Sequence, residues 1–260
     1  MKNLSMNRNQ IKYLVIVAML IDHIAWAWVP TASTLGQVMH FIGRLTGPTM
    51  AYFVAEGYRY TRDVKKYALR LFLFALISWP AFHMFEYNSL PIQFRWGMAQ
   101  GRGVWLFYIA ALDLTVGVFH DFGVIYTLFI SLLAIWLWDT KRIPLVLRVI
   151  GVAALIWGSQ YGDWPYFDVI WALIFFTLKD RPVLKWTGYC LVAGMVYFIF
   201  TPWQTDPRAG FFQLGVFMVP LLLTVFYNGE GGSKNRIHKW FFYVFYPAHL
   251  LLLTILKNMI

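Results

Sequence analysis

The sequence predicts an all-α polytopic membrane protein, built as one transmembrane domain over residues 1–260. Long apolar runs follow one another along the chain, and 60% of the residues are hydrophobic whereas only 13% are charged. A soluble domain carries about 25% charged residues. A transmembrane β-barrel would instead show alternating apolarity over about ten residues per strand. We therefore expect a multi-pass helical protein whose surroundings are the lipid bilayer of an inner or plasma membrane.

Apolar runs of sufficient length predict about nine transmembrane helices, within a range of roughly eight to ten. They are residues 11–30, 38–57, 67–86, 122–138, 143–159, 164–178, 183–201, 210–227 and 238–257. A further apolar run, 104–119, contains Asp113 and follows two glycines, Gly101 and Gly103. This run can either cross the membrane or lie at its surface, and the distribution of charge decides between the two.

Basic residues gather in the connections between alternate runs. The clusters lie at the N-terminus and at 59–70, 141–148, 179–185 and 234–239. Cationic connections remain on the cytoplasmic side of a membrane. All five clusters share one side if nine runs cross, the N-terminus lies inside, and 104–119 forms a re-entrant or surface helical segment within an outer insertion at 84–121. The net charge of +10 then reflects topology, and no nucleic-acid partner is expected.

Four ionisable residues fall within the predicted spans at similar depth: Asp22, His23, Arg44 and His249. Such a side chain costs several kcal/mol in a membrane unless it meets a partner or a polar cavity. One explanation is structural, since a histidine can serve packing and an aspartate can pair with an arginine. Four such residues in one layer favour a functional site, and we predict that they are its catalytic group.

Helical geometry relates this layer to the inner end of the first span. Lys12 and His23 are eleven residues apart, which is about 16 Å along a helix and within roughly 20° of whole turns. They therefore share one face, while Asp22 points about 100° away from His23. Asp22 is expected to pair with Arg44 or to reach His249 rather than to orient the His23 ring.

A second group of charges lies at the inner ends of the second and third spans. It can be a plain topology signal with lipid headgroup contacts, or a site for an anionic cytosolic ligand, because guanidinium groups bind phosphates in pairs of hydrogen bonds. No phosphate-binding glycine loop and no metal-binding spacing of Cys and His occurs, so no metal is expected. The predicted ligand-binding residues are Lys12, Glu56, Arg59, Arg62 and Arg70.

Five segments together resemble the TraX family of integral membrane proteins. They are LIDHIAW (20–26), FIGRLTGP (41–48), AEGYRYTRDVKKYALRLFLFALIS (55–78), GVIYTLFISLLAIWLW (123–138) and FFYVFYPAHLLLL (241–253). The resemblance covers nearly the whole chain in order and departs in 84–121 and at Phe122 and Gly123. The family is associated with N-terminal acetylation of conjugative pilin, so the resemblance implies acetyl transfer.

The first span is also similar to that of membrane acyltransferases that carry acetyl groups from cytosolic acetyl-CoA to extracytoplasmic glycans. Those proteins have a basic residue, ten intervening residues and then a histidine, the spacing of Lys12 and His23 here. This similarity implies acetyl-CoA as donor. We expect His23 to act as general base, because a histidine with a pKa near 7 suits that proton transfer, and Arg44 or His249 to stabilise the oxyanion. A covalent acetyl-histidine is an alternative route.

Two other function classes remain open on the sequence alone. Asp22, His23 and His249 could form the proton relay of a transporter or flippase, although no internal repeat of the kind many transporters show is visible. The chain could also be a structural partner in a secretion machine. For a transferase, the acceptor could be a peptide, a glycan or a lipid headgroup.

Overall fold

The computed structural model describes residues 5–89, 92–99, 102–109, 122–200, 207–233 and 235–259. Its elements run in the order α1 (Arg8–Trp28), α2 (Thr34–Gly43), α3 (Thr46–Tyr60), α4 (Val64–Tyr87), β1 (Ile92–Ala99), β2 (Arg102–Ile109), α5 (Val124–Asp139), α6 (Leu145–Gly158), η2 (Ser159–Tyr161), α7 (Phe167–Thr177), α8 (Pro182–Phe200), η3 (Pro207–Phe217), α9 (Met218–Leu221), η4 (Leu222–Phe226) and α10 (Arg236–Met259). The described chain is thus mainly helical, as predicted.

Short polar residues begin several of these helices. Asn7 and Gln10 form a reciprocal capping box at the start of α1, and the Asp63 side chain accepts a hydrogen bond from the Lys66 backbone N–H at the start of α4. Such caps satisfy backbone donors that the first helical turn leaves free. At the other end of α4, Asn88 adopts the left-handed conformation (φ 53°) that often terminates a helix.

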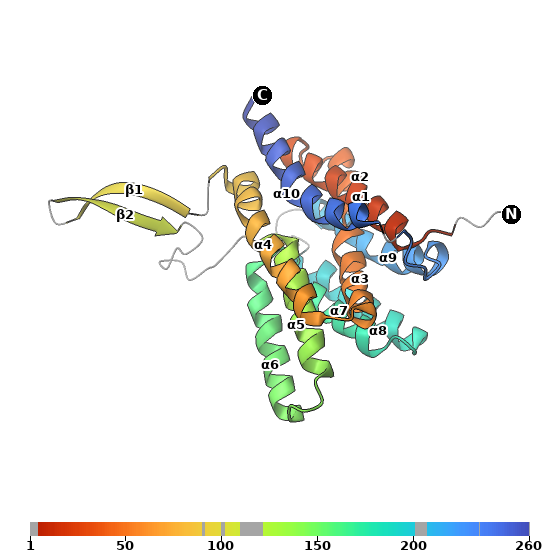
Figure 1. The fold of residues 1–260 in the computed structure, drawn as a ribbon. Coiled ribbons are helices and arrows are strands. Elements are labelled where there is room, and N and C mark those ends of the chain that lie inside the picture. The colour runs from red at the N-terminus through yellow and green to blue at the C-terminus, as the bar shows by residue number, and fades with distance from the viewer. Residues whose placement is uncertain are drawn as a thin grey trace.

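The helices pack as a bundle in which α3 contacts α1, α5 and α7, while α10 contacts both α1 and α4 (Figure 1). The first and last helices of the chain therefore lie side by side. The largest buried side chains include Trp171 and Phe175 of α7 and Tyr189 of α8, whose rings stack on one another. This aromatic core joins α7 to α8, and α7 in turn packs against α3.

The outer faces of the bundle are apolar. Among the residues of α6, Val152 is buried, while Leu145, Val146, Ile150 and Trp157 are exposed. In the part of the chain that the structure describes, four helical segments are long and apolar enough to cross a bilayer, namely Arg8–Trp28, Val64–Tyr87, Ala209–Phe226 and Arg236–Met259. The helices Val124–Asp139, Leu145–Tyr161 and Phe167–Thr177 are apolar but shorter. A helix that is apolar on its exposed face suits lipid rather than water. These features identify a membrane protein.

Two details of the predicted architecture are wrong. The predicted span 38–57 is not one helix, because it breaks at Arg44 and Leu45, between α2 and α3. The predicted helical segment 104–119 is a β-strand over its first part, since 102–109 pairs with 92–99 as an antiparallel hairpin in which Ile92 lies opposite Ile109. A short apolar run with aromatic residues does not distinguish strand from helix by periodicity. Residues 110–119 lie outside the described residues.

Candidate functional site

The break between α2 and α3 places Arg44 beside α1. Arg44 is the C-cap residue of α2, and its backbone N–H donates to the His40 carbonyl at 3.0 Å. Gly43 permits the close approach of the two helices, because a Cβ there would lie 2.3 Å from Cγ of Asp22. A side chain at this position would therefore force α1 and α2 apart.

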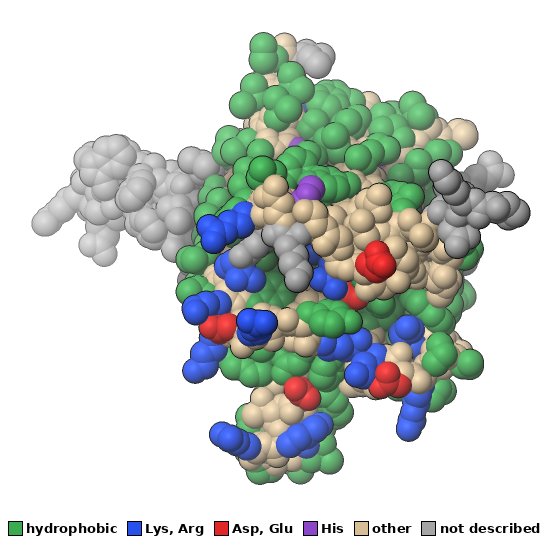
Figure 2. Space-filling model, turned by 45° about the vertical axis from the view of Figure 1, so that its right-hand side comes forward, with side chains coloured by type: hydrophobic (Ala, Val, Ile, Leu, Met, Phe, Trp, Pro, Cys, Tyr) green, Lys and Arg blue, Asp and Glu red, His purple; other side chains and the backbone are tan. Residues whose placement is uncertain are grey.

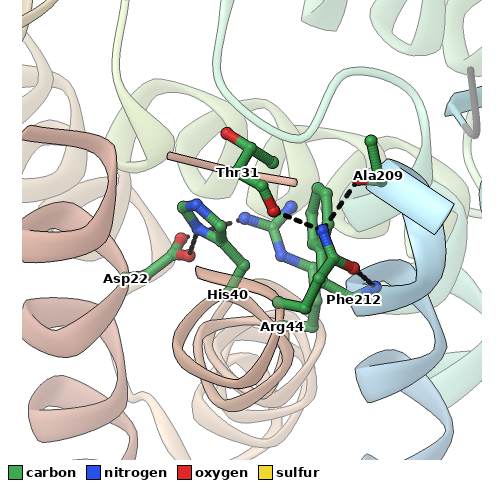
Figure 3. Close-up of polar contacts among 7 residues, drawn as sticks. Asp22, Thr31, His40, Arg44, Ala209 and Phe212 are labelled. Carbon is green, nitrogen blue, oxygen red and sulfur yellow. Dashed lines mark hydrogen bonds and ion pairs between the residues drawn. The ribbon is translucent and has the colours of Figure 1, made fainter. Parts of the chain in front are cut away.

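Asp22 uses both carboxylate oxygens in this contact. Oδ1 lies 2.7 Å from Nδ1 of His40, and Oδ2 accepts from Nη2 of Arg44 at 2.9 Å. Figure 3 shows His40 and Arg44 directed from α2 toward Asp22. The Arg44 guanidinium also lies over the rings of Trp164 and Phe212, at 4.6 and 5.1 Å from their centres. Asp22 is thus a buried ion-pair partner that joins α1 to α2.

Gln37 fixes the other side of α2. Its Nε2 donates to the carbonyls of Thr31 and Ala209 at 2.6 and 3.0 Å, and its Oε1 accepts from the Phe212 backbone N–H at 2.9 Å (Figure 3). These bonds hold η3 against α2. They also position the Phe212 ring over Arg44.

His23 and His249 form the second contact of the layer, between α1 and α10. Nε2 of His249 lies 3.1 Å from Nδ1 of His23, and Nδ1 of His249 lies 2.8 Å from the Phe245 carbonyl oxygen. A carbonyl only accepts, so His249 must donate from Nδ1. In the neutral ring its Nε2 then accepts from Nδ1–H of His23. This assignment leaves the lone pair of His23 on Nε2, the state that a general base requires.

A small cavity of about 20 Å³ adjoins His23. Met19 and Asp22 from α1, Thr46 from α3 and Tyr246 from α10 contribute to its wall. The Tyr246 hydroxyl accepts a hydrogen bond from the Val124 backbone N–H at 3.2 Å, at the first residue of α5. The N-terminus of α5 therefore faces the same space as His23.

The connection between α6 and α7 also reaches this cavity. Asp163 and Trp164 line it, and Trp164 has φ 58°. Tyr166 has φ 64° and ψ −50°, with the Phe167 N–H donating to the Pro165 carbonyl at 2.7 Å. This is a γ-turn of the strained kind, with positive φ at its centre. Strained backbone in a non-glycine residue concentrates at functional sites.

A larger cavity of about 400 Å³ lies near the start of α1. Arg8, Lys12, Arg70 and His238 line it together with apolar residues of α3 and α5. The Lys12 ammonium lies 5.5 Å from the ring centre of Phe53 and 5.4 Å from that of Phe242. The cavity thus combines several cationic groups with an apolar lining, and we call it the basic cavity.

Neighbouring residues of the same helices line the basic cavity and the His23 cavity. Met50 lines the first and Thr46 the second, one turn apart on α3. Ile125 lines the first and Val124 the second, as neighbours on α5. The two cavities are thus neighbours along α1, α3 and α5, with Lys12 in the wall of one and His23 in the wall of the other.

The remaining predicted ligand-binding residues have different surroundings. Glu56 is buried and accepts from Nε of Arg8 and from the Tyr227 hydroxyl, each at 2.7 Å. Arg59 donates from Nη2 to the carbonyls of Phe175 and Phe176. Carbonyls at a helix C-terminus lack intrahelical partners and attract cations, so Arg59 caps α7.

Arg62 is exposed and follows Thr61, which lines the basic cavity. The structure thus brings Lys12 and Arg70 into one cavity, places Glu56 beside it through Arg8, and holds Arg59 at the end of α7.

Sequence reasoning missed several residues of the site. Arg8 is four positions before Lys12, and His40 is four positions before Arg44, a spacing that places each pair on one helical face. This spacing could have revealed both. No spacing in the sequence pointed to Asp163, because it lies in a connection between two apolar runs, and the sequence of such a connection does not show which helices it will contact. Among the described residues, no group of three or more His, Cys, Asp or Glu side chains is arranged to hold a metal ion.

Comparisons with known proteins agree with the resemblance noted in the sequence. The family model described as TraX protein matches residues 7–99 and 104–257. The probable fimbrial assembly protein FimC, serogroup H1, of Dichelobacter nodosus is 27% identical over 260 residues, covering 98% of each chain. No solved structure matches. The match extends over most of the chain, and the protein belongs to the TraX family.

Proposed function

We propose that this protein is a transmembrane acyltransferase that moves an acetyl group from acetyl-CoA to an amine or hydroxyl of an extracytoplasmic or membrane-associated acceptor. The observation that carries the proposal is that the basic cavity and the His23 cavity are neighbours along α1. A cationic site at one end and an imidazole at the other suit a donor with phosphates at one end and a thioester at the other.

The donor would enter through the basic cavity. Arg8, Lys12 and Arg70 supply cations there, and Arg62 stands exposed beside the cavity wall, where it could meet a nucleotide phosphate. The pantetheine arm, which is apolar over part of its length, would follow the lining toward Met50. Glu56 supports the site by holding Arg8, and Arg59 supports it by holding α7.

His23 would act as the general base. With Nδ1–H donated to His249, its Nε2 can accept the proton of the acceptor as the acceptor attacks the thioester carbonyl. A histidine suits this transfer because its ordinary pKa lies near neutral pH. His249 would position the ring and fix its tautomer. Asp22 and Arg44 would hold α1 against α2, and so keep His23 at the end of the donor path.

The membrane orientation is part of the proposal. Figure 2 shows Lys and Arg side chains gathered on the lower half of the face in view, with a largely hydrophobic upper half. With that lower half in the cytosol, acetyl-CoA reaches the basic cavity directly and the acceptor approaches from the outer side of an inner or plasma membrane. The name of the relative, a fimbrial assembly protein, supports a peptide acceptor involved in cell-surface assembly, with glycan and lipid acceptors as the alternatives.

Two measurements test this proposal, the binding of acetyl-CoA and the transfer of its acetyl group. Purified protein should bind acetyl-CoA in calorimetry and should transfer radiolabelled acetyl from it to a cell-envelope extract. Lys12→Met and Arg70→Met should each weaken acetyl-CoA binding by about tenfold to a hundredfold, because a charge-assisted hydrogen bond contributes about 1.5–3 kcal/mol.

Lys141→Met is the matched control, since Lys141 is an exposed cation in the turn between α5 and α6. It should leave the affinity unchanged. Equal affinity in all three variants would show that the basic cavity does not hold the donor, and the absence of labelled product with every extract fraction would overturn the assignment as a transferase.

A further inference from the structure

Tyr246 is a polar group of the His23 cavity that the mechanism above does not use. It is 3% exposed and lies on α10, three residues before His249, so both side chains share one face of the helix. The ring centres of Tyr246 and His23 are 6.5 Å apart, at an interplanar angle of 69°. Both residues line the same small cavity. The phenol therefore belongs to the space where the transfer would occur.

The hydroxyl oxygen of Tyr246 accepts a hydrogen bond from the backbone at the start of α5. The Val124 backbone N–H donates to it at 3.2 Å, and this N–H belongs to the first turn of α5, where no intrahelical acceptor exists. Since the oxygen accepts this bond, the phenolic proton remains available for donation to another group. A donor that also accepts from a backbone N–H is polarised and forms a stronger hydrogen bond.

Gly123 makes this arrangement possible. A Cβ at Gly123 would lie 2.2 Å from the Tyr246 oxygen, closer than any real contact. The glycine thus lets the hydroxyl reach the positive end of α5. That end carries a partial positive charge and favours negative charge near it.

We propose that Tyr246 is a further catalytic residue, whose hydroxyl donates a hydrogen bond to the oxyanion that forms on the thioester carbonyl. This inference rests on the proposed function and adds a role that the histidines cannot fill, because His23 takes the proton of the acceptor and His249 holds His23.

The acceptor nitrogen or oxygen forms a bond to the carbonyl carbon, its proton passes to Nε2 of His23, and the π electrons move to the carbonyl oxygen, where the Tyr246 hydroxyl stabilises them. Collapse of this intermediate breaks the carbon–sulfur bond, and His23 returns the proton to the departing thiolate. The products are the acetylated acceptor and free CoA. Donors that meet such an oxyanion lower the barrier by roughly 2.7–4 kcal/mol.

The first test is Tyr246→Phe, which removes only the phenolic oxygen. We expect kcat to fall by about 10²–10³-fold, while the affinity for acetyl-CoA stays within twofold. Tyr189→Phe is the matched control, because its buried hydroxyl also makes one backbone hydrogen bond, to the Val216 carbonyl at 2.7 Å. That variant should lose comparable stability and keep kcat.

Two further variants separate catalysis from packing. Gly123→Ala should lower kcat by displacing the hydroxyl, and combining it with Tyr246→Phe should add little, because both remove the same interaction. Fluorotyrosine at position 246, which is a stronger donor of nearly the same shape, should change kcat in proportion to its donor strength. A purely structural hydroxyl would give no such dependence.

The outcomes distinguish this inference from the proposed function. An active unaltered protein whose Tyr246→Phe variant keeps kcat within threefold would overturn the role of Tyr246 and leave the transferase assignment standing. An unaltered protein that transfers no acetyl group would overturn both.

Discussion

Nε2 of His249 lies 3.1 Å from Nδ1 of His23, although the two residues are 226 positions apart in the chain. This contact joins the first and last helices at the depth of the candidate site. It also assigns the ring nitrogens, because His249 donates to the Phe245 carbonyl and must therefore accept from His23. His249 is thus a positioning residue in the proposed mechanism.

Replacement of His249 should follow a graded order. His249→Gln keeps an oxygen that can accept from Nδ1–H of His23, whereas His249→Leu leaves that N–H without its partner. We expect a loss of kcat of roughly tenfold for Gln and roughly a hundredfold or more for Leu, as second partners of a functional histidine contribute on this scale. The KM for acetyl-CoA should not change. Initial rates at saturating donor measure the order, and equal rates for Gln and Leu would contradict it.

The pairing of Asp22 with Arg44 predicts a large effect on folding. Asp22→Asn removes the carboxylate that pairs with the largely buried Arg44 guanidinium, and breaking such a pair costs up to about 3–5 kcal/mol. The double variant Asp22→Asn with Arg44→Gln removes both charges and should recover part of this loss. Reversible unfolding in mixed micelles measures the cycle.

The exposed pair of Asp63 and Lys66, with Oδ2 and Nζ 3.3 Å apart, provides the control for the cycle. Lys66→Met should leave the stability nearly unchanged, because an exposed ion pair contributes little. A similar small effect for Asp22→Asn would mean that the buried pair does not hold α1 to α2.

Gly43 offers a test of the close approach of α1 and α2. Gly43→Ala places a methyl group 2.3 Å from Cγ of Asp22, and overpacking of this kind costs about 1–3 kcal/mol. Gly194→Ala in α8 is the matched control, because no described heavy atom lies within 4 Å of the position of its Cβ. That variant should be neutral or stabilising by roughly 0.5–1 kcal/mol. Thermal unfolding compares the two, and equal melting temperatures would contradict the predicted clash.

The topology remains a prediction of the sequence. With nine crossings and the N-terminus inside, a cysteine at Lys141 should be labelled from the same side as a cysteine at Asn9, after Cys190, the lone native cysteine, has been replaced. Impermeant maleimides added to sealed inside-out and right-side-out vesicles measure this. Labelling of the two positions from opposite sides would mean an odd number of crossings between them.

The layer of polar groups was predictable because charge inside an apolar run is costly and must find a partner. Asp22 and Arg44 meet in the structure, as do His23 and His249. Counting residues along an ideal helix gives the depth of a side chain in the membrane and the helical face on which it lies, and both are local properties. The contact of Asp22 with His40 was not predicted, although His40 lies four positions before Arg44 in the sequence and so on the same helical face.

Other features depend on tertiary contacts that no local pattern encodes. Arg59 sits in a basic cluster, yet its partners are carbonyls of α7 more than a hundred residues later. The break at Arg44 is different, because Gly43, Gly47 and Pro48 lie around it as local breaker residues, and only the averaged hydropathy of the run hides it. The hairpin at 92–109 was missed because aromatic apolar residues fit a strand as well as a helix.

The proposed mechanism depends on His23 taking the proton of the acceptor. His23→Gln keeps a similar size and a hydrogen-bonding group but cannot hold that proton. The decisive measurement is the initial rate of acetyl transfer by His23→Gln at saturating acetyl-CoA, with donor binding checked separately. The account predicts unchanged affinity for acetyl-CoA and a rate lower by roughly 10²–10⁴-fold. A variant that keeps most of the activity would contradict it.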